Sequence, residues 1–191
     1  MNLNKKRCPW AILSDEKYVE YHDKEWGVPL FDDNRLFEML VLEGAQAGLS
    51  WRTILHRRNE YRRCFLEFNP EKVARMTNDD VETLMLTGGI IRNRLKISSA
   101  IKNAKVFIDI VEKYGSFSNY YWNWVDGKPI INNFKTMDEV PAKTPLSEAI
   151  SKDLKGRGMS FVGATIIYSF MQATGMVNDH LTSCFRHKEL Y

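Results

Sequence analysis

Several features that define large protein classes are absent from this sequence. No run of about 18 consecutive apolar residues occurs, so we expect no membrane-spanning helix. The N-terminal segment carries charges without an apolar run behind them, which argues against a secretory signal. Three cysteines in 191 residues are too few for a disulfide scaffold and suit a reducing compartment, so we expect a cytoplasmic protein.

Composition and length are those of an ordinary folded domain. Apolar residues make up 44% and charged residues 27% of the chain, which excludes intrinsic disorder, collagen and low-complexity scaffolds. A length of 191 residues predicts one domain, or two small domains that share a core. Neither an internal repeat nor a linker of biased composition divides the chain, so we expect a single unit over residues 1–191.

Positive charge is concentrated in two segments, although the net charge is only +3. Residues 52–63 contain five arginines against one glutamate, and residues 92–105 contain five basic residues and no acidic one. Such segments are typical of proteins that bind a polyanion such as DNA. The alternative is that they are solvated helix faces.

Apolar periodicity and capping residues predict helices through most of the chain. Asp32 or Asp33, Ser50 and Asn69 are expected to cap helix starts. No alternation of polar and apolar residues is long enough to predict a sheet, and residues 125–145 are expected to be irregular. The predicted fold class is therefore all-α, with the two termini gathered into a subdomain. The expected helices cover residues 15–25, 33–47, 50–65, 69–76, 77–85, 93–114, 116–124, 145–155 and 161–174.

A two-glycine turn, Gly88-Gly89, joins two of the expected helices, 77–85 and 93–114. A tight turn of small residues leaves backbone amides free, and the following helix start adds the positive end of its dipole. Together these groups can hold a phosphate oxygen, which positions DNA without reading its sequence. The alternative is an ordinary glycine-capped connection between two helices.

Two residues near the C-terminus, His180 and Cys184, have a spacing that suits metal binding. On a helical turn their side chains would lie on one face and could grip one ion. Cys8 and His22, near the other terminus, are available as two further ligands, and a site of this kind would join the chain ends. The alternative is two unrelated histidines and two buried cysteines.

Glu43 lies at the inner edge of the apolar face formed by Leu36 and Leu40 on the expected helix 33–47. A buried carboxylate needs a partner, because an unpaired charge is costly to remove from water. A nearby arginine is one candidate partner. The other is a flat, electron-poor or cationic ring, held by stacking and cation–π attraction in a pocket of aromatic residues. The aromatic candidates are Tyr18, Tyr21, Trp10, Trp26 and Trp51.

Five segments are distinctive: YVEYHDKEWG at 18–27, LEGAQAGLSW at 42–51, GIIRNR at 89–94, FVGAT at 161–165 and NDHLTSC at 178–184. Taken together, they resemble the bacterial 3-methyladenine DNA glycosylase I family, which belongs to the helix-hairpin-helix DNA glycosylases. The resemblance follows the expected order over residues 8–184 and includes long, unusual motifs. It departs from the wider superfamily in two ways: the hairpin lacks the second glycine of the general pattern, and we find no strong candidate for the usual catalytic aspartate.

The resemblance implies an all-α fold with a structural zinc ion and a hairpin within residues 84–96. It implies that Glu43 recognises a base flipped out of the DNA, and Glu43 is the candidate catalytic residue. The implied zinc ligands are Cys8, His22, His180 and Cys184. The base pocket is expected to contain Tyr18, Tyr21, Glu43, Trp51 and Trp10, and the expected DNA contacts are Gly88, Gly89, Ile90, Ile91, Arg92, Arg94 and Lys96.

The implied activity is excision of 3-methyladenine from alkylated double-stranded DNA, which leaves an abasic site. Methylation at N3 gives the attached adenine a positive charge, so the base leaves as a neutral molecule and needs no protonation. No lysine is clearly placed as a nucleophile, so we expect a monofunctional glycosylase, acting as a monomer. Two alternatives are a DNA-binding protein without activity and a zinc hydrolase, but the latter needs an open metal position.

Overall fold

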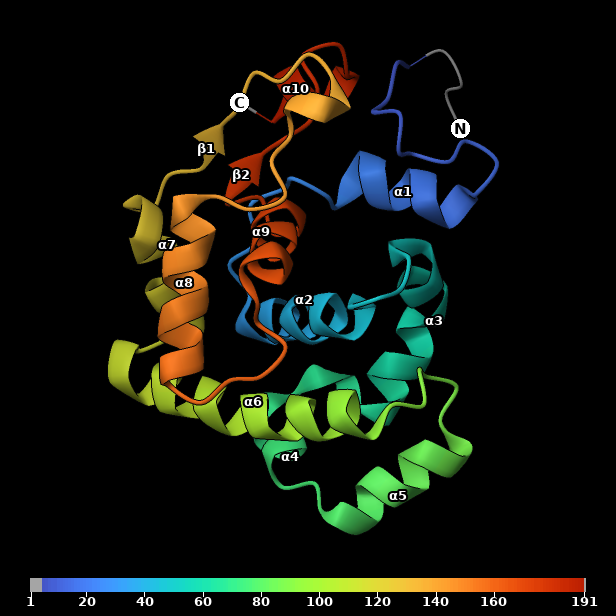
Figure 1. The fold of residues 1–191 in the computed structure, drawn as a ribbon, viewed down its shortest axis with the longest axis vertical. Helices are drawn as coiled ribbons and strands as arrows, with labels where there is room; N and C mark the ends of the chain where they lie inside the picture. The colour runs from blue at the N-terminus through green and yellow to red at the C-terminus, as the bar shows by residue number, and fades with distance from the viewer. Residues whose placement is uncertain (1–4, 191) are drawn as a thin grey trace.

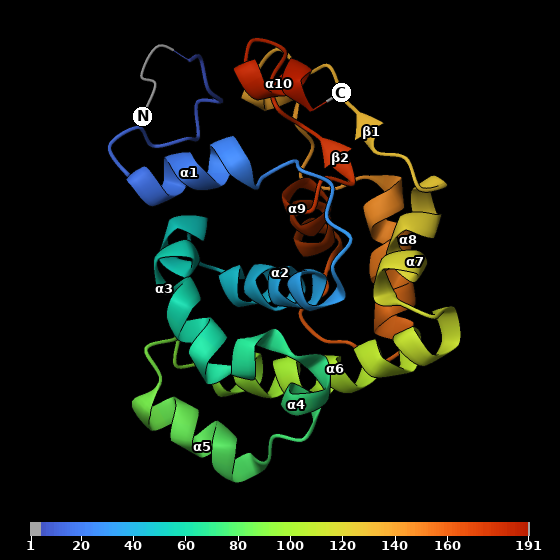
Figure 2. The ribbon, with the colours of Figure 1, turned by 180° about the vertical axis from the view of Figure 1, so that it is seen from behind.

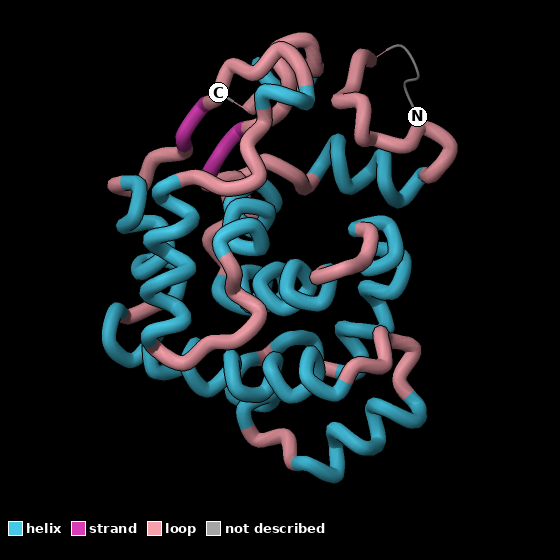
Figure 3. Tube along the Cα trace, in the orientation of Figure 1, coloured by secondary structure: helices cyan, strands magenta, loops and turns pink. Residues whose placement is uncertain are grey.

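The computed structural model describes residues 5–190, and residues 1–4 and 191 lie outside the described residues. The first part of the N-terminal segment, in which we expect no secretory signal, therefore falls outside the described residues. Helices make up most of the described chain, as Figure 3 shows, and the predicted all-α class is confirmed. No helix between residues 5 and 190 combines the length and the apolar character that crossing a bilayer requires. The helices are α1 (Glu16–Lys24), α2 (Asp33–Gln46), α3 (Trp51–Cys64), α4 (Pro70–Ala74), α5 (Asn78–Thr87), α6 (Arg94–Tyr114), α7 (Phe117–Trp122), α8 (Pro145–Gly156), α9 (Ala164–Ala173) and α10 (Phe185–Glu189). Short 3₁₀ turns are η1 (Leu66–Phe68), η2 (Asn123–Val125) and η3 (Met137–Glu139), and the strands are β1 (Ile130–Ile131) and β2 (Val177–Asn178).

Side-chain caps fix the predicted helix starts. The side chains of Asp32, Ser50 and Asn69 each accept a hydrogen bond from the backbone amide three residues later, at 2.9, 3.2 and 2.9 Å. Each bond satisfies one of the amides that a helix start leaves unpaired. At the other end of α6, Gly115 adopts a left-handed φ of 82°, which ends the helix. These local signals explain why most helix bounds could be predicted within a few residues.

The C-terminal third departs from the predicted pattern. Helix α9 begins at Ala164 rather than at Phe161, because Phe161 has a left-handed φ of 56° and Gly163 is the N-cap. Helix α10 was not predicted, since a helix of five residues is too short to show periodicity. Strands β1 and β2 pair in parallel, with Ile130 opposite Val177, and two residues per strand are too few to show alternation.

Helix α2 forms the centre of the hydrophobic core. Its residues Leu36, Phe37, Leu40 and Leu42 are essentially inaccessible to solvent. Helices α3, α6, α7 and α9 pack against it. Figures 1 and 2 show α2 lying between α3, α6 and α9 from both sides of the molecule. The end of α2 that carries Glu43 therefore belongs to a helix that is packed on several sides.

The N- and C-terminal segments lie together at one end of the molecule. The amide of Phe185, at the start of α10, donates a hydrogen bond to the carbonyl oxygen of Lys6 at 2.9 Å. Figure 1 shows α1 and α10 at the same end of the ribbon, above α2. The expected gathering of the two termini is therefore present.

Candidate active site and metal cluster

A cavity of about 200 Å³ lies among α1, α2, the start of α3 and α9. All five residues that were expected in the base pocket line this one cavity: Trp10, Tyr18, Tyr21, Glu43 and Trp51. Trp26, which was also an aromatic candidate in the sequence, lines the same cavity. The lining residues that sequence reasoning missed are Gln46, Met137, Val140, Ser169, Gln172 and Asp179.

Aromatic rings form the walls of the cavity and hold one another in place. Tyr21 and Trp51 pack at a tilt with ring centroids 5.2 Å apart, and both are almost fully buried. Trp10 meets Tyr18 edge to face at 5.7 Å and Trp26 edge to face at 4.9 Å. Because these contacts leave each ring little freedom, the walls are preformed for a flat, aromatic ligand.

Glu43 is buried in this cavity, with 4% of its surface exposed. Burial raises the pKa of its carboxyl group from 4.5 to about 8, because the charged form loses its hydration. Within the described chain, the carboxyl group has neither a hydrogen bond nor an ion pair. The site thus contains a carboxyl group that is free to bond to a ligand.

The arginines of α3 are engaged elsewhere, so none of them serves as the alternative partner of Glu43. Arg58 is buried and binds both Glu38 and Glu25, and Arg62 also binds Glu38. The basic segment 52–63 is therefore largely an ion-paired helix face rather than a free cationic surface. Its remaining arginine ion pairs are Arg52 with Asp15 and Arg63 with Glu60, and His56 Nε2 also lies 2.7 Å from Asp15 Oδ2.

Asp179 is a second buried carboxylate in the cavity, with 2% of its surface exposed. It accepts hydrogen bonds from Asn132, Tyr168 and Gln172 at 2.7, 2.6 and 2.8 Å. Sequence reasoning missed it because the segment 178–184 was considered only for metal ligands. Its partners lie on other elements, so no local spacing could have indicated its surroundings.

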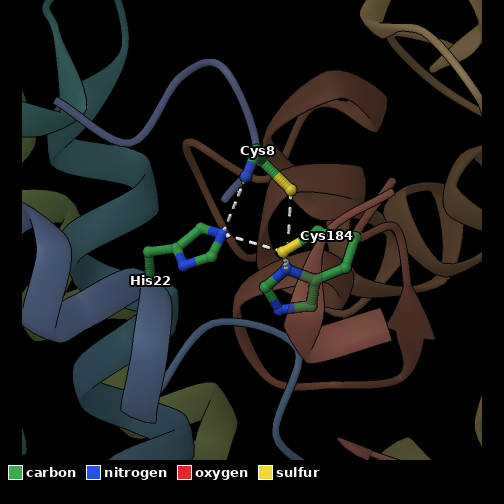
Figure 4. Close-up of side chains that lie close together, drawn as sticks. Cys8, His22 and Cys184 are labelled. Carbon is green, nitrogen blue, oxygen red and sulfur yellow. Dashed lines mark hydrogen bonds between the residues drawn. The ribbon is translucent and has the colours of Figure 1, made fainter. Parts of the chain in front are cut away.

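The four candidate metal ligands, from both ends of the chain, meet in one buried cluster. The ligand atoms of Cys8, His22, His180 and Cys184 all lie within 4.8 Å of one another. The Cys184 sulfur lies 3.5 Å from His22 Nε2 and 3.6 Å from His180 Nδ1, and the Cys8 sulfur lies 3.5 Å from His180 Nδ1. Figure 4 shows Cys8, His22 and Cys184 converging from separate segments. This group could hold one metal ion.

The second nitrogen of each histidine ring has its own partner. His22 Nδ1 lies 2.8 Å from Asp23 Oδ1, and His180 Nε2 lies 3.0 Å from the carbonyl oxygen of Trp26. These acceptors fix each ring so that its remaining nitrogen faces the cluster, as metal-binding histidines require. In addition, a hydrogen bond from the Cys8 thiol holds the pKa of the Cys184 thiol well below its ordinary value.

One detail of the metal prediction is wrong. His180 and Cys184 do not lie on a helical turn, because residues 179–184 form an irregular turn and Cys184 is the N-cap of α10. The two side chains converge because the amide of Cys184 donates to the carbonyl oxygen of Leu181 at 2.7 Å, which closes a tight turn. The predicted proximity holds although the predicted local structure does not.

The predicted glycine turn is a connection of six residues, 88–93, between α5 and α6. A Cβ atom at Gly88 would lie 2.7 Å from the backbone carbonyl oxygen of Leu84, so this position has no room for a side chain. At Gly89 a Cβ atom would lie 2.7 Å from Cγ of Glu60, and the Glu60 side chain would have to move. Helix α3 holds this connection, since Arg57 donates to the Gly89 carbonyl oxygen at 2.8 Å. The turn is thus fixed from one side.

Several amides of this connection have no acceptor within residues 5–190, namely those of Gly89, Ile90 and Arg92. The amide of Ile91, in contrast, donates to the Tyr61 hydroxyl at 3.4 Å. The free amides lie just before the start of α6, where the helix dipole favours an anion.

The three basic residues expected to contact DNA differ in their surroundings. Arg92 is exposed. Arg94 forms an ion pair with Glu82, and its Nη2 lies 2.8 Å from Glu82 Oε2. The Lys96 ammonium is half-buried and donates to the carbonyl oxygens of Ala45 and Ala47 at 2.8 and 2.6 Å, at the end of α2. Arg92 is therefore the one cation of the three whose side chain has no ion pair or hydrogen bond within residues 5–190.

Comparison with known proteins places the chain in a family. The family model described as methyladenine glycosylase matches residues 10–187. The DNA-3-methyladenine glycosylase 1 of Escherichia coli (strain K12) is 49% identical over 179 residues, which cover 94% of this chain and 95% of that protein.

Solved structures agree with this relationship. A crystal structure of 3-methyladenine DNA glycosylase I superposes with a TM-score of 0.90 at 50% identity and covers 94% of this chain and 98% of its own. A crystal structure of a variant of 3-methyladenine DNA glycosylase I, in complex with 3-methyladenine, superposes with a TM-score of 0.88 at 38% identity, covering 90% and 92% of the two chains. The chain therefore belongs to the methyladenine glycosylase family.

Proposed function

We propose that this protein is a monofunctional DNA-3-methyladenine glycosylase that removes 3-methyladenine from alkylated double-stranded DNA. The observation that carries the proposal is the cavity in which aromatic walls surround the unpartnered carboxyl group of Glu43. Membership of the family supports the same substrate. The products are the free base and an abasic site, and the enzyme acts in base-excision repair.

The protein does not need to protonate the leaving group, because the base already carries a positive charge. The oxygen of a water molecule bonds to C1′ of the sugar while the bond between C1′ and the base nitrogen breaks. The electron pair of that bond goes to the cationic base, which leaves neutral, and the water releases a proton to solvent. The protein must extract the nucleotide from the stack, which costs a few kcal/mol and less for a damaged base.

Glu43 is the proposed catalytic and recognition residue. Its carboxyl group accepts a hydrogen bond from the adenine edge, and a cationic base favours its ionised form over the protonated form that burial favours. Trp51 and Tyr21 stack on the ring, and Tyr18 and Trp10 complete the pocket. A hydrogen bond to a charged group is typically worth about 1.5–3 kcal/mol, which suits a discriminating contact.

The proposed DNA-binding element is a helix-hairpin-helix formed by α5, the connection 88–93 and α6. Free amides and a helix start there suit a phosphate group. Because the hairpin and the pocket are both complete within one chain, we also propose that the enzyme acts as a monomer. The residues of the proposed DNA contact are Gly88, Gly89, Ile90, Ile91, Arg92, Arg94 and Lys96.

The proposed metal is a structural zinc ion held by the Cys2His2 cluster. Tetrahedral zinc, with bonds of about 2.0 Å to nitrogen and 2.3 Å to sulfur, keeps its ligand atoms roughly 3.3–3.8 Å apart. The distances of 3.5–3.6 Å from Cys184 and Cys8 to the histidine nitrogens fit this geometry. Four protein ligands would leave zinc no open position, so its role would be to join the two ends of the chain.

Release of 3-methyladenine from methylated duplex DNA tests the proposal. Chromatography should detect the free base with methylated DNA and none with unmethylated DNA. The treated strand should stay intact until alkali cleaves it at the abasic site, which separates a monofunctional enzyme from one that also cuts the backbone. Binding to methylated DNA without release of any base would indicate a DNA-binding protein without activity and would contradict the proposal.

A further inference from the structure

The base pocket contains two buried carboxyl groups with opposite surroundings. Glu43 has no hydrogen-bond partner among the described residues, whereas Asp179 accepts hydrogen bonds from three side chains. An ionised carboxylate only accepts hydrogen bonds and offers about four acceptor positions, so three of those of Asp179 are filled. The protein thus supplies Asp179 with hydrogen-bond donors and leaves Glu43 without any.

The three donors come from elements that hold them firmly. Tyr168 and Gln172 lie on α9, which packs against α2. Asn132 follows β1, and its amide donates to the carbonyl oxygen of Asn178 at 3.1 Å. Hydrogen bonds from neutral donors stabilise the anion without cancelling its charge. No lysine or arginine within residues 5–190 forms an ion pair with Asp179, so its charge acts on the pocket.

We propose that Asp179 is the standing negative charge of the base pocket and that it selects the cationic, N3-methylated nucleotide over neutral adenine. The inference rests on the proposed function, because it assigns a role within the same site. It differs from the role of Glu43, which bonds to the edge of the base. Asp179 acts through its charge and does not require a contact that forms or breaks.

The selection follows from where the charge is during the reaction. The methylated nucleotide enters the pocket with one positive charge, and that charge is shared between base and sugar as the bond breaks. A buried anion therefore stabilises both the bound substrate and the transition state relative to free DNA, more strongly than it would in water. Normal adenine gains nothing from it, and neither does the neutral base after release. Product therefore leaves without this attraction.

Asp179→Asn is the direct test, since it removes the charge and keeps the shape. We expect kcat/KM for release of 3-methyladenine from methylated duplex DNA to fall about 10-fold or more, mainly through a higher KM. The Kd of free, neutral 3-methyladenine should change less than about 2-fold. Asp153→Asn is the matched control, because Asp153 also accepts from a tyrosine hydroxyl, at 2.7 Å, but lies outside the pocket. Its kcat/KM should equal that of the parent.

Glu43→Gln provides a second test, which does not depend on the folding of the Asp179 variant. The probes are two duplexes: one carries 3-methyladenine on a 2′-fluoro sugar, which slows hydrolysis and keeps the base cationic. The other carries 3-methyl-3-deazaadenine, a neutral base of the same shape. Glu43→Gln should still bind the cationic duplex more tightly than the neutral one, because Asp179 remains.

Three results would overturn the inference. They are an unchanged kcat/KM in Asp179→Asn, an equal loss of kcat/KM and of free-base affinity in that variant, and a lost preference for the cationic duplex in Glu43→Gln. The second result would make Asp179 a structural support of the pocket. A parent protein that releases no base would instead contradict the proposed function itself, and that result is obtained before any variant is made.

Discussion

The imidazole of His22 meets the imidazole of His180 edge to face, with ring centroids 4.8 Å apart. His22 lies on α1, the helix that also presents Tyr18 and Tyr21 to the pocket. His180 directly follows Asp179, which lines the pocket from the other side. The contact between the two histidines therefore joins two walls of the candidate active site, and the metal cluster and the pocket form one structural unit.

Removal of one metal ligand should weaken this unit. Cys184→Ala is expected to lower both zinc content and melting temperature, because formation of a closed zinc site is coupled to folding. Metal analysis and thermal unfolding of the purified protein measure both effects. Cys64→Ala is a suitable control, since Cys64 is buried but lies outside the cluster. Full zinc occupancy in Cys184→Ala would exclude the proposed ligand set.

Glu43→Gln should weaken binding of free 3-methyladenine roughly 10- to 100-fold, since a hydrogen bond to a charged group is worth about 1.5–3 kcal/mol. The substitution keeps the size of the side chain but replaces a carboxyl group, which a hydrogen bond donated by the bound base favours in its ionised form, by a neutral amide. Titration calorimetry measures the affinity, while circular dichroism and metal analysis check that fold and zinc content are unchanged. If the variant binds the free base as tightly as the parent, Glu43 has only a structural role.

The raised pKa of Glu43 predicts a pH dependence of stability. The pKa is about 8 in the folded protein and 4.5 as its ordinary value, so between these pH values the folded state holds a proton that the unfolded state has lost. The contribution of Glu43 to the free energy of unfolding should therefore fall as pH rises from about 5 to about 8, and then level off. Relative to Glu43→Gln, the loss should reach a few kcal/mol.

Urea unfolding at several pH values, with zinc in excess, measures this difference. Subtraction of the two proteins at each pH removes the contributions of all other titrating groups. A difference that stays constant between pH 5 and pH 8 would show that the carboxyl group of Glu43 titrates near its ordinary pKa.

Loss of a basic residue at the hairpin should weaken binding to DNA whether or not the DNA contains a methylated base. Arg92→Ala is expected to reduce affinity for methylated and unmethylated duplexes alike and to flatten the dependence of affinity on salt concentration. Lys96→Ala should do the same and should also lower release of 3-methyladenine, because the hydrogen bonds to Ala45 and Ala47 are lost. Lys113→Ala is the control, because Lys113 is exposed in the last turn of the same helix, α6, far along it from the hairpin. A changed preference between bases with an unchanged salt slope would place these residues elsewhere.

Local signals in the sequence account for most of the helices and for part of the site. Caps such as Ser50 and Asn69 act within three residues, so they can be found without the fold. The metal group and the aromatic pocket were also predicted, partly from residue types and partly from the family resemblance. The cluster joins Cys8 to Cys184 across the chain, and spacing alone left that pairing open.

What the sequence did not indicate depends on partners that are distant along the chain. The arginines of α3 look like a cationic surface in the sequence, but Arg58 and Arg62 bind Glu38 of α2. Asp179 gains its donors only when Asn132 and α9 come together. Ion pairs and hydrogen bonds of this kind are set by packing, and packing has no signature in a window of neighbouring residues.

The two hydrogen bonds from Lys96 to the carbonyl oxygens of Ala45 and Ala47 fix the start of α6 against the end of the helix that carries Glu43. The structure of the protein therefore fixes the distance between the hairpin and the pocket. A DNA strand held at the hairpin would offer the pocket a nucleotide at one set position along the strand.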